Sequence, residues 1–215
     1  MNVLVIGANG TTGRHVIDLL AKSGKYYAKG MVRQEEQKET IEKLGGLPVM
    51  GDLEKDFSSA FEEVDAVIFT AGSGGHTGAD KTKAIDKEGA IKAIDLAKKH
   101  GVEKFVMLSA IGAGDPSQLD LDESMEGYYD AKHHADKHLM ESGLTFTIVR
   151  PGLLTDKKAT GRIRAAGKLL DQDGEITRED VAKVLVQSIK ADNLNQKAIE
   201  ILNDEEEIEQ VLSRL

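Results

Sequence analysis

The sequence contains no cysteine, and it contains no long run of apolar residues. Without cysteine the chain cannot form a disulfide, a thiol nucleophile or a thiolate metal site, and it needs no oxidising compartment. The apolar run that follows Met1 ends at Gly7, which is too short for a signal sequence or a membrane span. We therefore expect a cytoplasmic protein with no membrane partner.

Basic residues are outnumbered by acidic ones. The chain has 28 lysines and arginines against 37 aspartates and glutamates, a formal net charge of −9 that is spread along the sequence. Nucleic-acid binding requires a clustered basic face that neutralises phosphates, so we expect no nucleic-acid partner. The length of 215 residues suits one domain, which we take to be residues 1–215.

Short apolar segments alternate with amphipathic ones along the chain, which predicts an α/β fold with a doubly wound parallel sheet and helices on both faces. The last quarter is less regular, although Thr177 and Asp180 have the form of a capping box that begins a helix. The strands are predicted over residues 3–6, 26–32, 47–50, 65–70, 103–109, 145–149 and 198–202, and the helices over 35–44, 80–99, 128–142 and 177–189, with one helix after residue 13 and one after residue 204.

Three glycines, Gly7, Gly10 and Gly13, lie directly after the first predicted strand and before an amphipathic helix. In a dinucleotide site the first permits a tight turn, the second lets the backbone approach a pyrophosphate, and the third lets the helix pack closely on the strand. The free N–H groups at the helix tip then attract the phosphates. The alternative is an ordinary glycine-rich turn, but the complete strand–helix–strand unit favours a dinucleotide site. That site also takes in Asn9, Thr11 and Thr12.

The end of the second predicted strand indicates which dinucleotide is bound. An NAD site usually places an acidic residue there to accept a hydrogen bond from the ribose 2′-hydroxyl. This chain has Arg33 instead, and Glu35 and Glu36 fall within the next helix. A guanidinium matches a 2′-phosphate in charge and geometry, so we expect NADP in preference to NAD. Arg33 could alternatively be a solvated residue, and Arg14 could assist the binding.

The glycine loop and Arg33 occur together with Ser109 at the end of the fifth predicted strand and with the segment Tyr128-Tyr-Asp-Ala-Lys132. With these motifs the chain resembles the short-chain dehydrogenase/reductase superfamily over essentially its whole length. It is most similar to the small atypical, epimerase/dehydratase-like members, which are relatives of flavin/biliverdin reductases and of regulators of nitrogen metabolite repression. The resemblance implies a Rossmann-type domain with a small C-terminal substrate-side extension.

The resemblance also implies catalytic roles. Tyr128 and Lys132 are four residues apart and share one helix face, so both can reach the same ligand. Tyr128 would act as the acid–base group, favoured as phenolate by the lysine, while Ser109 polarises a substrate carbonyl. Asp86 stands where many of these dehydrogenases carry asparagine. An anion there holds the proton of Lys132 more firmly and weakens its effect on Tyr128.

Further cofactor contacts follow from the same resemblance. Lys132 would hold the nicotinamide ribose. The remaining matched segments end the third, fourth and sixth strands, where the family places adenine, ribose and nicotinamide, and they comprise Asp52, Leu53, Thr70, Ala71, Gly72, Pro151 and Gly152.

The histidines do not indicate a metal site. His134 and His138 have a helical i, i+4 spacing, but no HExxH pattern occurs, and a solvated helix face explains them. His76 falls in the loop over the expected nicotinamide edge, where it either touches substrate or faces solvent.

Two hypotheses of different class follow. The first is an NADPH-dependent oxidoreductase for a small carbonyl, quinone or flavin-like acceptor, with an epimerase or dehydratase as its enzymatic variant. The second is a non-catalytic NADP(H) sensor that reports the redox state to a protein partner. In either case we expect a monomer or a homodimer, with the substrate side formed by residues 112–127 and 153–176. Residues 155–174 carry three lysines and two arginines, which suit an anionic substrate or a solvated lid.

Overall fold

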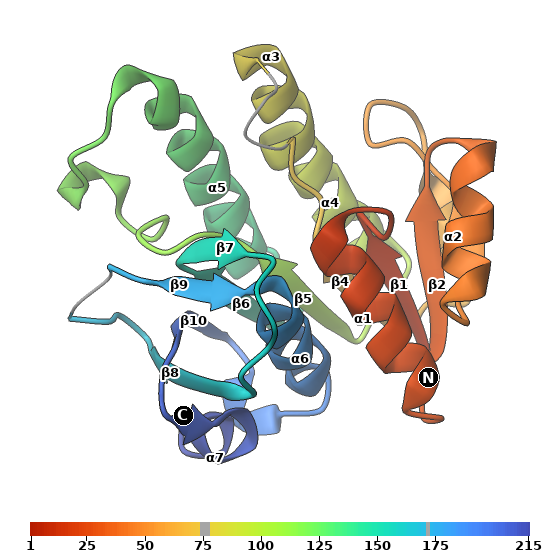
Figure 1. Cartoon of the computed structure of the whole chain (residues 1–215). Helices are drawn as coiled ribbons and strands as arrows, with labels where there is room; N and C mark the ends of the chain where they lie inside the picture. The colour runs from red at the N-terminus through yellow and green to blue at the C-terminus, as the bar shows by residue number, and fades with distance from the viewer. Residues whose placement is uncertain (74–77, 171–172) are drawn as a thin grey trace.

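A mostly parallel sheet of nine strands forms the centre of the protein (Figure 1). The structure is a computed structural model that describes residues 1–73, 78–170 and 173–215. Seven parallel strands are β1 (Asn2–Ile6), β2 (Tyr27–Val32), β3 (Leu47–Met50), β4 (Ala66–Phe69), β5 (Lys104–Leu108), β6 (Phe146–Pro151) and β10 (Lys197–Asn203). The antiparallel strands β8 (Arg162–Ala166) and β11 (Glu206–Glu207) complete one edge.

The strand order is β11-β8-β10-β6-β5-β4-β1-β2-β3, so the chain reverses direction across the sheet after β3. After that strand it crosses from the β2 side of β1 to the β4 side. The point between β1 and β4 is therefore a topological switch point, where open α/β sheets bind their ligands at the carboxyl ends of the strands. A separate parallel pair, β7 (Leu153–Thr155) with β9 (Glu175–Thr177), lies beyond the end of β6.

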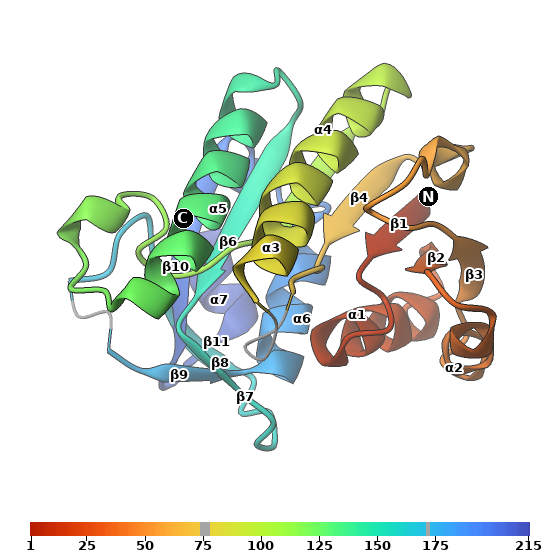
Figure 2. The same cartoon turned by 90° about the horizontal axis from the view of Figure 1, so that it is seen from above.

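Helices cover both faces of the sheet. Figure 2 shows α4 (Ala90–Lys99) and α5 (Glu123–Glu141) on one face and α1 (Thr11–Lys22) and α6 (Arg178–Ser188) on the other. The remaining helices are α2 (Lys38–Lys43), α3 (Ala79–Lys81), α7 (Ile208–Ser213), the π-helix η3 (Thr82–Gly89) and the 3₁₀ helices η1 (Glu35–Gln37), η2 (Ser58–Phe61), η4 (Pro116–Gln118) and η5 (Asp192–Leu194).

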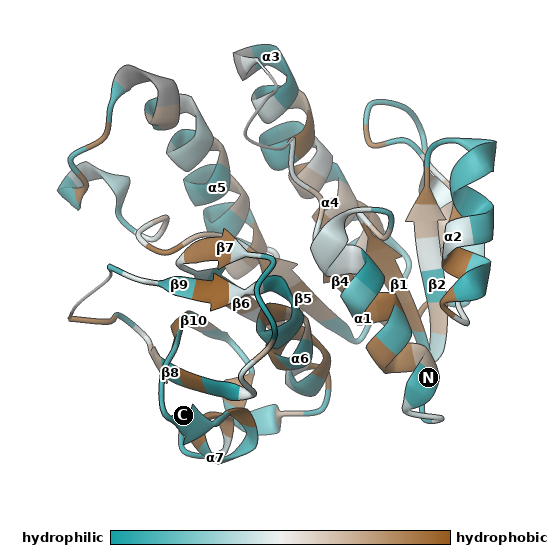
Figure 3. Cartoon of the chain, viewed as in Figure 1, coloured by the Kyte–Doolittle hydropathy of each residue, from teal (hydrophilic) through white to brown (hydrophobic). Residues whose placement is uncertain are grey.

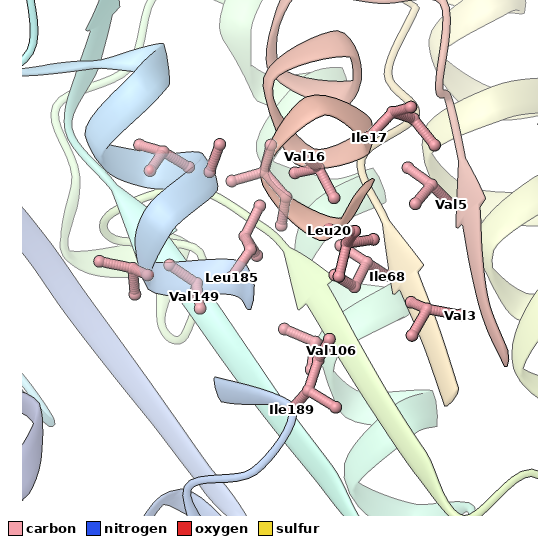
Figure 4. Packing of buried hydrophobic residues seen from close by; sticks show 14 of the residues in the cluster. Val3, Val5, Val16, Ile17, Leu20, Ile68, Val106, Val149, Leu185 and Ile189 are labelled. Carbon is pink, nitrogen blue, oxygen red and sulfur yellow. The ribbon is translucent and has the colours of Figure 1, made fainter. Parts of the chain in front are cut away.

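The alternation of side chains along the strands divides the core into two halves. Val3 and Val5 of β1 pack toward α1 and α6, whereas Leu4 and Ile6 pack in the cluster with α4 and α5. Figure 4 shows the first half, in which residues of α1 and of four strands meet Leu185 of α6. The apolar colour in Figure 3 is concentrated on the strands, because both faces of the sheet are covered.

The predicted doubly wound sheet is confirmed, and all seven predicted strands are present within two residues of their expected ends. The Thr177 cap is also confirmed, because its hydroxyl accepts a hydrogen bond of 3.1 Å from the Asp180 backbone N–H. Two predictions were wrong. Helix α5 begins at Glu123 rather than at 128, and the substrate-side segment 153–176, for which no strand was predicted, carries strands β7 and β8 and most of β9.

No helix in the described part of the chain combines the length and the apolar character that a bilayer-spanning segment requires.

Candidate functional site

Two glycines where β1 meets α1 stand at positions that have no room for a side chain. Gly7 has a positive φ of 86°, and a Cβ there would lie 2.5 Å from the backbone N of Ala71. A Cβ on Gly13 would lie 2.2 Å from the carbonyl O of Gly7. The Gly10 N–H donates to that same carbonyl at 3.0 Å and closes the turn. The loop therefore brings the tip of α1 against the end of β1, as a diphosphate-binding turn requires.

The N-terminus of α1 has neither a side-chain cap nor an acidic residue in its first turn. Its N-cap is Gly10, which supplies no side-chain hydrogen bond. The N–H groups of Thr11, Thr12 and Gly13 in this turn have no i−4 partner within the helix. Together with the helix dipole, this tip is suited to an anion. Arg14 donates to the Asn9 side chain at 2.8 Å and orders the adjoining loop.

A cleft of about 430 Å³ opens at the carboxyl ends of β1, β2 and β4, at the switch point of the sheet. Nine of the residues predicted to bind the cofactor line it, drawn from four segments far apart in the sequence. They are Gly7, Asn9, Gly10, Arg33, Asp52, Leu53, Thr70, Ala71 and Gly72. The backbone loop, the uncapped helix tip and this cleft together fit a dinucleotide, with the pyrophosphate at α1.

Arg33 lies at the mouth of this cleft, just after β2. Its backbone N–H is held at 3.1 Å by the Gln37 side-chain oxygen, whereas its guanidinium makes no ion pair within the described part of the chain. No carboxylate from this turn lines the cleft, and Glu35 is occupied by Lys38 at 2.8 Å. A cationic group is thus available where a ribose 2′-phosphate would lie.

Sequence reasoning missed several residues of the cleft. Gln37 lines it and orders the Arg33 turn, and its place at the start of a helix four residues after Arg33 was a usable signal. Lys81 also lines it, and its ammonium pairs with Glu54 at 2.6 Å across the cleft mouth. No sequence signal connects those two residues, which lie 27 positions apart. The other lining residues are Met31, Val32, Gly51, Ser73 and Ile85.

A buried ion pair lies directly beneath one edge of the cleft. Lys132 of α5 and Asp86 of η3 are 2.9 Å apart, and their side chains are 8% and 1% exposed. The Asp86 carboxylate also accepts a hydrogen bond of 2.8 Å from the backbone N–H of Ser73. A Cβ on Gly72 would lie 3.2 Å from the same carboxylate. Asp86 therefore connects α5 to the cleft lining. It is supplied by a π-helical segment, a local distortion that is frequent at functional sites.

Tyr128 and Lys132 share one face of α5, as their spacing predicts. The Lys132 ammonium lies 5.6 Å from the centroid of the Tyr128 ring. Burial alone would lower the pKa of Lys132, but its electrostatic interactions with Tyr128 and Asp86 outweigh burial and raise the pKa above its usual value. Lys132 is therefore held as a cation beside the phenol. Tyr129 packs edge-on against Tyr128, with ring centroids 5.4 Å apart, and burial raises the pKa of Tyr129.

Ser109 does not line the cleft. Its hydroxyl is buried at the end of β5 beside Asp136 of α5, and it has no hydrogen-bond partner of good geometry in the described structure. Asp136 pairs with Arg150 of β6 at 2.9 Å. Burial raises the pKa of Asp136, and Arg150, Ser109 and Lys132 oppose that rise. The Asp136–Arg150 pair was missed from the sequence, although an arginine within an apolar strand was a signal for it.

Pro151 and Gly152 lie apart from the cleft lining, at the end of β6. The Pro151 carbonyl accepts a hydrogen bond of 2.9 Å from the Ile111 N–H, and the Gly152 N–H donates one of 3.2 Å to the Ile201 carbonyl. A Cβ on Gly152 would lie 2.3 Å from the Leu202 side chain. These backbone groups thus join β5, β6 and β10 at the end where the nicotinamide is expected, and their contact with a cofactor stays a prediction.

Within the described residues no group of three or more histidine or acidic side chains could hold a metal ion. His134 pairs with Asp130 at 3.1 Å, and His138 with Asp95 at 2.7 Å, so each has its own carboxylate on an exposed helix face. His76 lies outside the described residues.

Comparison with known proteins agrees with this site. The model of a family described as NAD(P)H-binding matches residues 7–192. An uncharacterised sugar epimerase of Bacillus subtilis, YhfK, is 40% identical over the whole of both chains. A solved structure from Bacillus halodurans, provisionally named an NAD-dependent epimerase/dehydratase, is 42% identical and has a TM-score of 0.96 over the whole of both chains. The oxidoreductase YlbE of Lactococcus lactis is 27% identical with a TM-score of 0.88, over 100% of this chain and 96% of that one.

Proposed function

The chain belongs to the NAD(P)H-binding family, and from that premise we propose that it is an NADPH-dependent oxidoreductase for a small carbonyl, quinone or flavin-like acceptor. The observation that carries the proposal is the cationic Lys132, which Asp86 holds beneath the cleft edge and beside Tyr128. The name of the Lactococcus relative, an oxidoreductase, supports the same reaction class.

When bound, the reduced nicotinamide supplies a hydride. Tyr128 donates its phenolic proton to the carbonyl oxygen as the new C–H bond forms and the C=O π bond breaks, and water returns the proton to Tyr128. The positive charge of Lys132 stabilises the phenolate, and Asp86 fixes the position of that charge while reducing its field at Tyr128. Quinone and flavin-like acceptors depend less on a strong proton donor, which suits such a moderated pair.

The test of the chemistry is a Tyr128→Phe variant supplied with NADPH and a panel of carbonyls and quinones. Removing the phenol should lower kcat on carbonyls by about 10²–10⁴-fold, because a positioned acid contributes that much. Tyr129→Phe is the matched control, since it removes the neighbouring phenol and should leave kcat within about twofold. Equal turnover by Tyr128→Phe and wild type would remove Tyr128 from the mechanism.

We propose NADP rather than NAD as the cofactor because the Arg33 guanidinium is available at the cleft mouth. Arg33→Glu should weaken NADP binding by about 10–100-fold, since an attractive charge is replaced by a repulsive one, and should leave NAD binding nearly unchanged. Calorimetric titration of both dinucleotides measures this. Lys25→Glu, which makes the same charge change at an exposed position after α1, should leave both affinities unaltered. An unaltered NADP preference in Arg33→Glu would exclude this role.

A second candidate is an epimerase or dehydratase, which the names of the two relatives at 40% and 42% identity favour. In such a reaction the cofactor returns to its starting state, so NADPH is not consumed. Protein that retains a tightly bound dinucleotide, interconverts a sugar nucleotide and oxidises no added NADPH would favour this candidate over the oxidoreductase.

A further inference from the structure

A second cavity, of about 550 Å³, lies beside α5 and shares no lining residue with the dinucleotide cleft. Its walls are α5, the loop 112–119 and the segment 167–170, and its floor is formed by side chains of β6 and β10. A volume in this range suits a small organic ligand. The two loops belong to the segments predicted for the substrate side, but the proposed reaction uses none of the charged groups in this cavity.

The floor of the cavity contains an arginine with unused hydrogen-bonding capacity. Arg150 is 7% exposed, and its Nε donates to Asp136 at 2.9 Å. Its two terminal nitrogens make no hydrogen bond or ion pair with a described residue, and the side chain lines the cavity. Gly114 gives the guanidinium its space, because a Cβ there would lie 2.4 Å from Nη1. A buried cationic fork with both prongs unpaired is costly unless a ligand completes it.

The acidic groups around the cavity are already engaged. Glu200, the cross-strand neighbour of Arg150, accepts from the N–H groups of Gly112 at 3.3 Å and Leu169 at 2.8 Å. It thereby fastens both covering loops to the sheet. Asp115 accepts from its neighbours Ser117 and Gln118. Asp136 accepts from Arg150 through one oxygen, and its other oxygen has no hydrogen-bond partner in the described structure. Among the described groups of the cavity floor, the open donors are therefore the terminal nitrogens of Arg150.

We propose that this cavity binds an organic monocarboxylate, whose two oxygens accept from the terminal nitrogens of Arg150. That fork matches a planar carboxylate in a bidentate manner. Leu119, Leu169 and Met140 line the walls, so the remainder of the acid is apolar. Lys137 and Lys168 also line the cavity, but Asp136 and Glu200 are the charged neighbours of Arg150 itself, and they disfavour a second negative charge at the guanidinium, as in phosphate. The site does not depend on the proposed oxidoreductase activity.

The test is calorimetric titration of the full-length protein with 2-naphthoate and hexanoate, each compared with its neutral amide, and with inorganic phosphate. Each carboxylate should bind about tenfold or more tightly than its amide, because a charge-assisted pair is replaced by a neutral contact, and phosphate should bind least. Equal affinity for acid and amide, or no binding of any probe, would overturn the proposal.

Three variants locate the binding. Gly114→Ala should displace the guanidinium, and Arg150→Lys should keep the charge beside Asp136 but remove the fork, so both should lose the acid-over-amide preference. Arg162→Lys, at an exposed arginine paired with Glu207, is the matched control and should keep it. Leu170→Glu alters a fully exposed residue at the cavity mouth and so preserves the fold. It should weaken the acids selectively. An undiminished preference in Gly114→Ala, Arg150→Lys and Leu170→Glu, equal to that of the control, would overturn the proposal.

A final experiment distinguishes a carboxylate that is part of the substrate from one that binds without reacting. If the acid is part of the substrate, adding it with NADPH should cause loss of the reduced-nicotinamide absorbance. If the acid is a separate ligand, it should bind with the affinity measured by calorimetry and should leave the reduced-nicotinamide absorbance unchanged. Either result supports the site, and NADPH oxidation that persists without any carboxylate binding would refute the site while leaving the proposed activity intact.

Discussion

Two buried lysines lie near opposite ends of the same sheet, and their surroundings shift their pKa values in opposite directions. At the carboxyl end Lys132 is paired with the Asp86 carboxylate, and its electrostatic interactions with Tyr128 and Asp86 raise its pKa against the effect of burial. At the amino end Lys104, the first residue of β5, donates to the neutral side chains of Thr147 and Asn195 and pairs with no carboxylate of the described residues. Burial lowers the pKa of Lys104 to about 8.

The difference shows that the fold tolerates a buried lysine either way, but of these two lysines only Lys132, at the end that carries the cleft, has its pKa raised. Burial disfavours the charged form at both ends, and a counter-charge reverses the outcome at that one. The same end holds the uncapped tip of α1 and the guanidinium of Arg33, which makes no ion pair with a described residue. Positive charge and free donors are thus concentrated where an anionic dinucleotide would bind.

The largest expected effect comes from making Lys132 resemble Lys104. Asp86→Asn removes the carboxylate and leaves a buried cation without its counter-charge, which should cost about 3–5 kcal/mol of unfolding free energy at neutral pH. The pKa of Lys132 should fall, so the deficit should shrink as the pH is raised. Denaturant unfolding at several pH values measures both effects.

The matched control for that variant is Asp95→Asn. Asp95 is 62% exposed and pairs with His138 at 2.7 Å, so its loss should change the unfolding free energy by only about 0.5 kcal/mol. Similar decreases in the unfolding free energy of the two variants would show that the buried Asp86–Lys132 pair contributes no more to stability than an exposed pair.

A smaller free-energy change is expected when a single methyl group is added to the glycine loop at the cleft. Gly13→Ala places a Cβ 2.2 Å from the Gly7 carbonyl, a backbone atom that cannot move aside, so the tip of α1 must shift. NADP affinity should fall by about 100-fold, or about 2.7 kcal/mol, as measured by calorimetry. Gly127→Ala is the control: nothing lies within 4 Å of its Cβ, and it should leave binding unchanged. Wild-type affinity in Gly13→Ala would contradict the proposed phosphate contact.

The smallest effect belongs to the amino end. The folded-state pKa of Lys104 is about 8 and its ordinary value is 10.5, so between those values the unfolded chain holds a proton that the folded protein has released. Stability from this residue therefore rises as the pH increases from about 8 toward 10.5. Compared with Lys104→Met, the wild type should gain about 1–3 kcal/mol between pH 7 and pH 10. A pH-independent difference would show that Lys104 titrates normally.

The sequence predicts the binding end of the fold better than the substrate side. The glycine loop, the strand ends and the Tyr128–Lys132 spacing are all local patterns that a single turn or helix face enforces. Strands β7, β9 and β11 are two or three residues long, too short to show any periodicity, so tertiary packing decides them. The first residues of α5 are polar, and they extend the helix beyond the point where an apolar pattern could reveal it.

Side-chain pairs between distant elements were the least accessible. Lys132 and Asp86 were connected only through a family motif, and the strand-end pattern at Pro151 and Gly152 did not single out the adjoining Arg150. Its partner Asp136 lies in a helix whose other charged residues are mostly exposed, so nothing in the sequence distinguishes it. The burial of such a pair depends on how α5 packs on the sheet, which no local signal determines.

The turn around Gly7 is formed by main-chain atoms, and this has a consequence for how the protein can diverge. Mutation replaces side chains but leaves the peptide groups in place, so most substitutions around the turn leave its N–H groups intact. Descendants could therefore exchange residues near Arg33 or around the α5 cavity, and so acquire new cofactor preferences or new ligands, without rebuilding the turn proposed to bind the diphosphate.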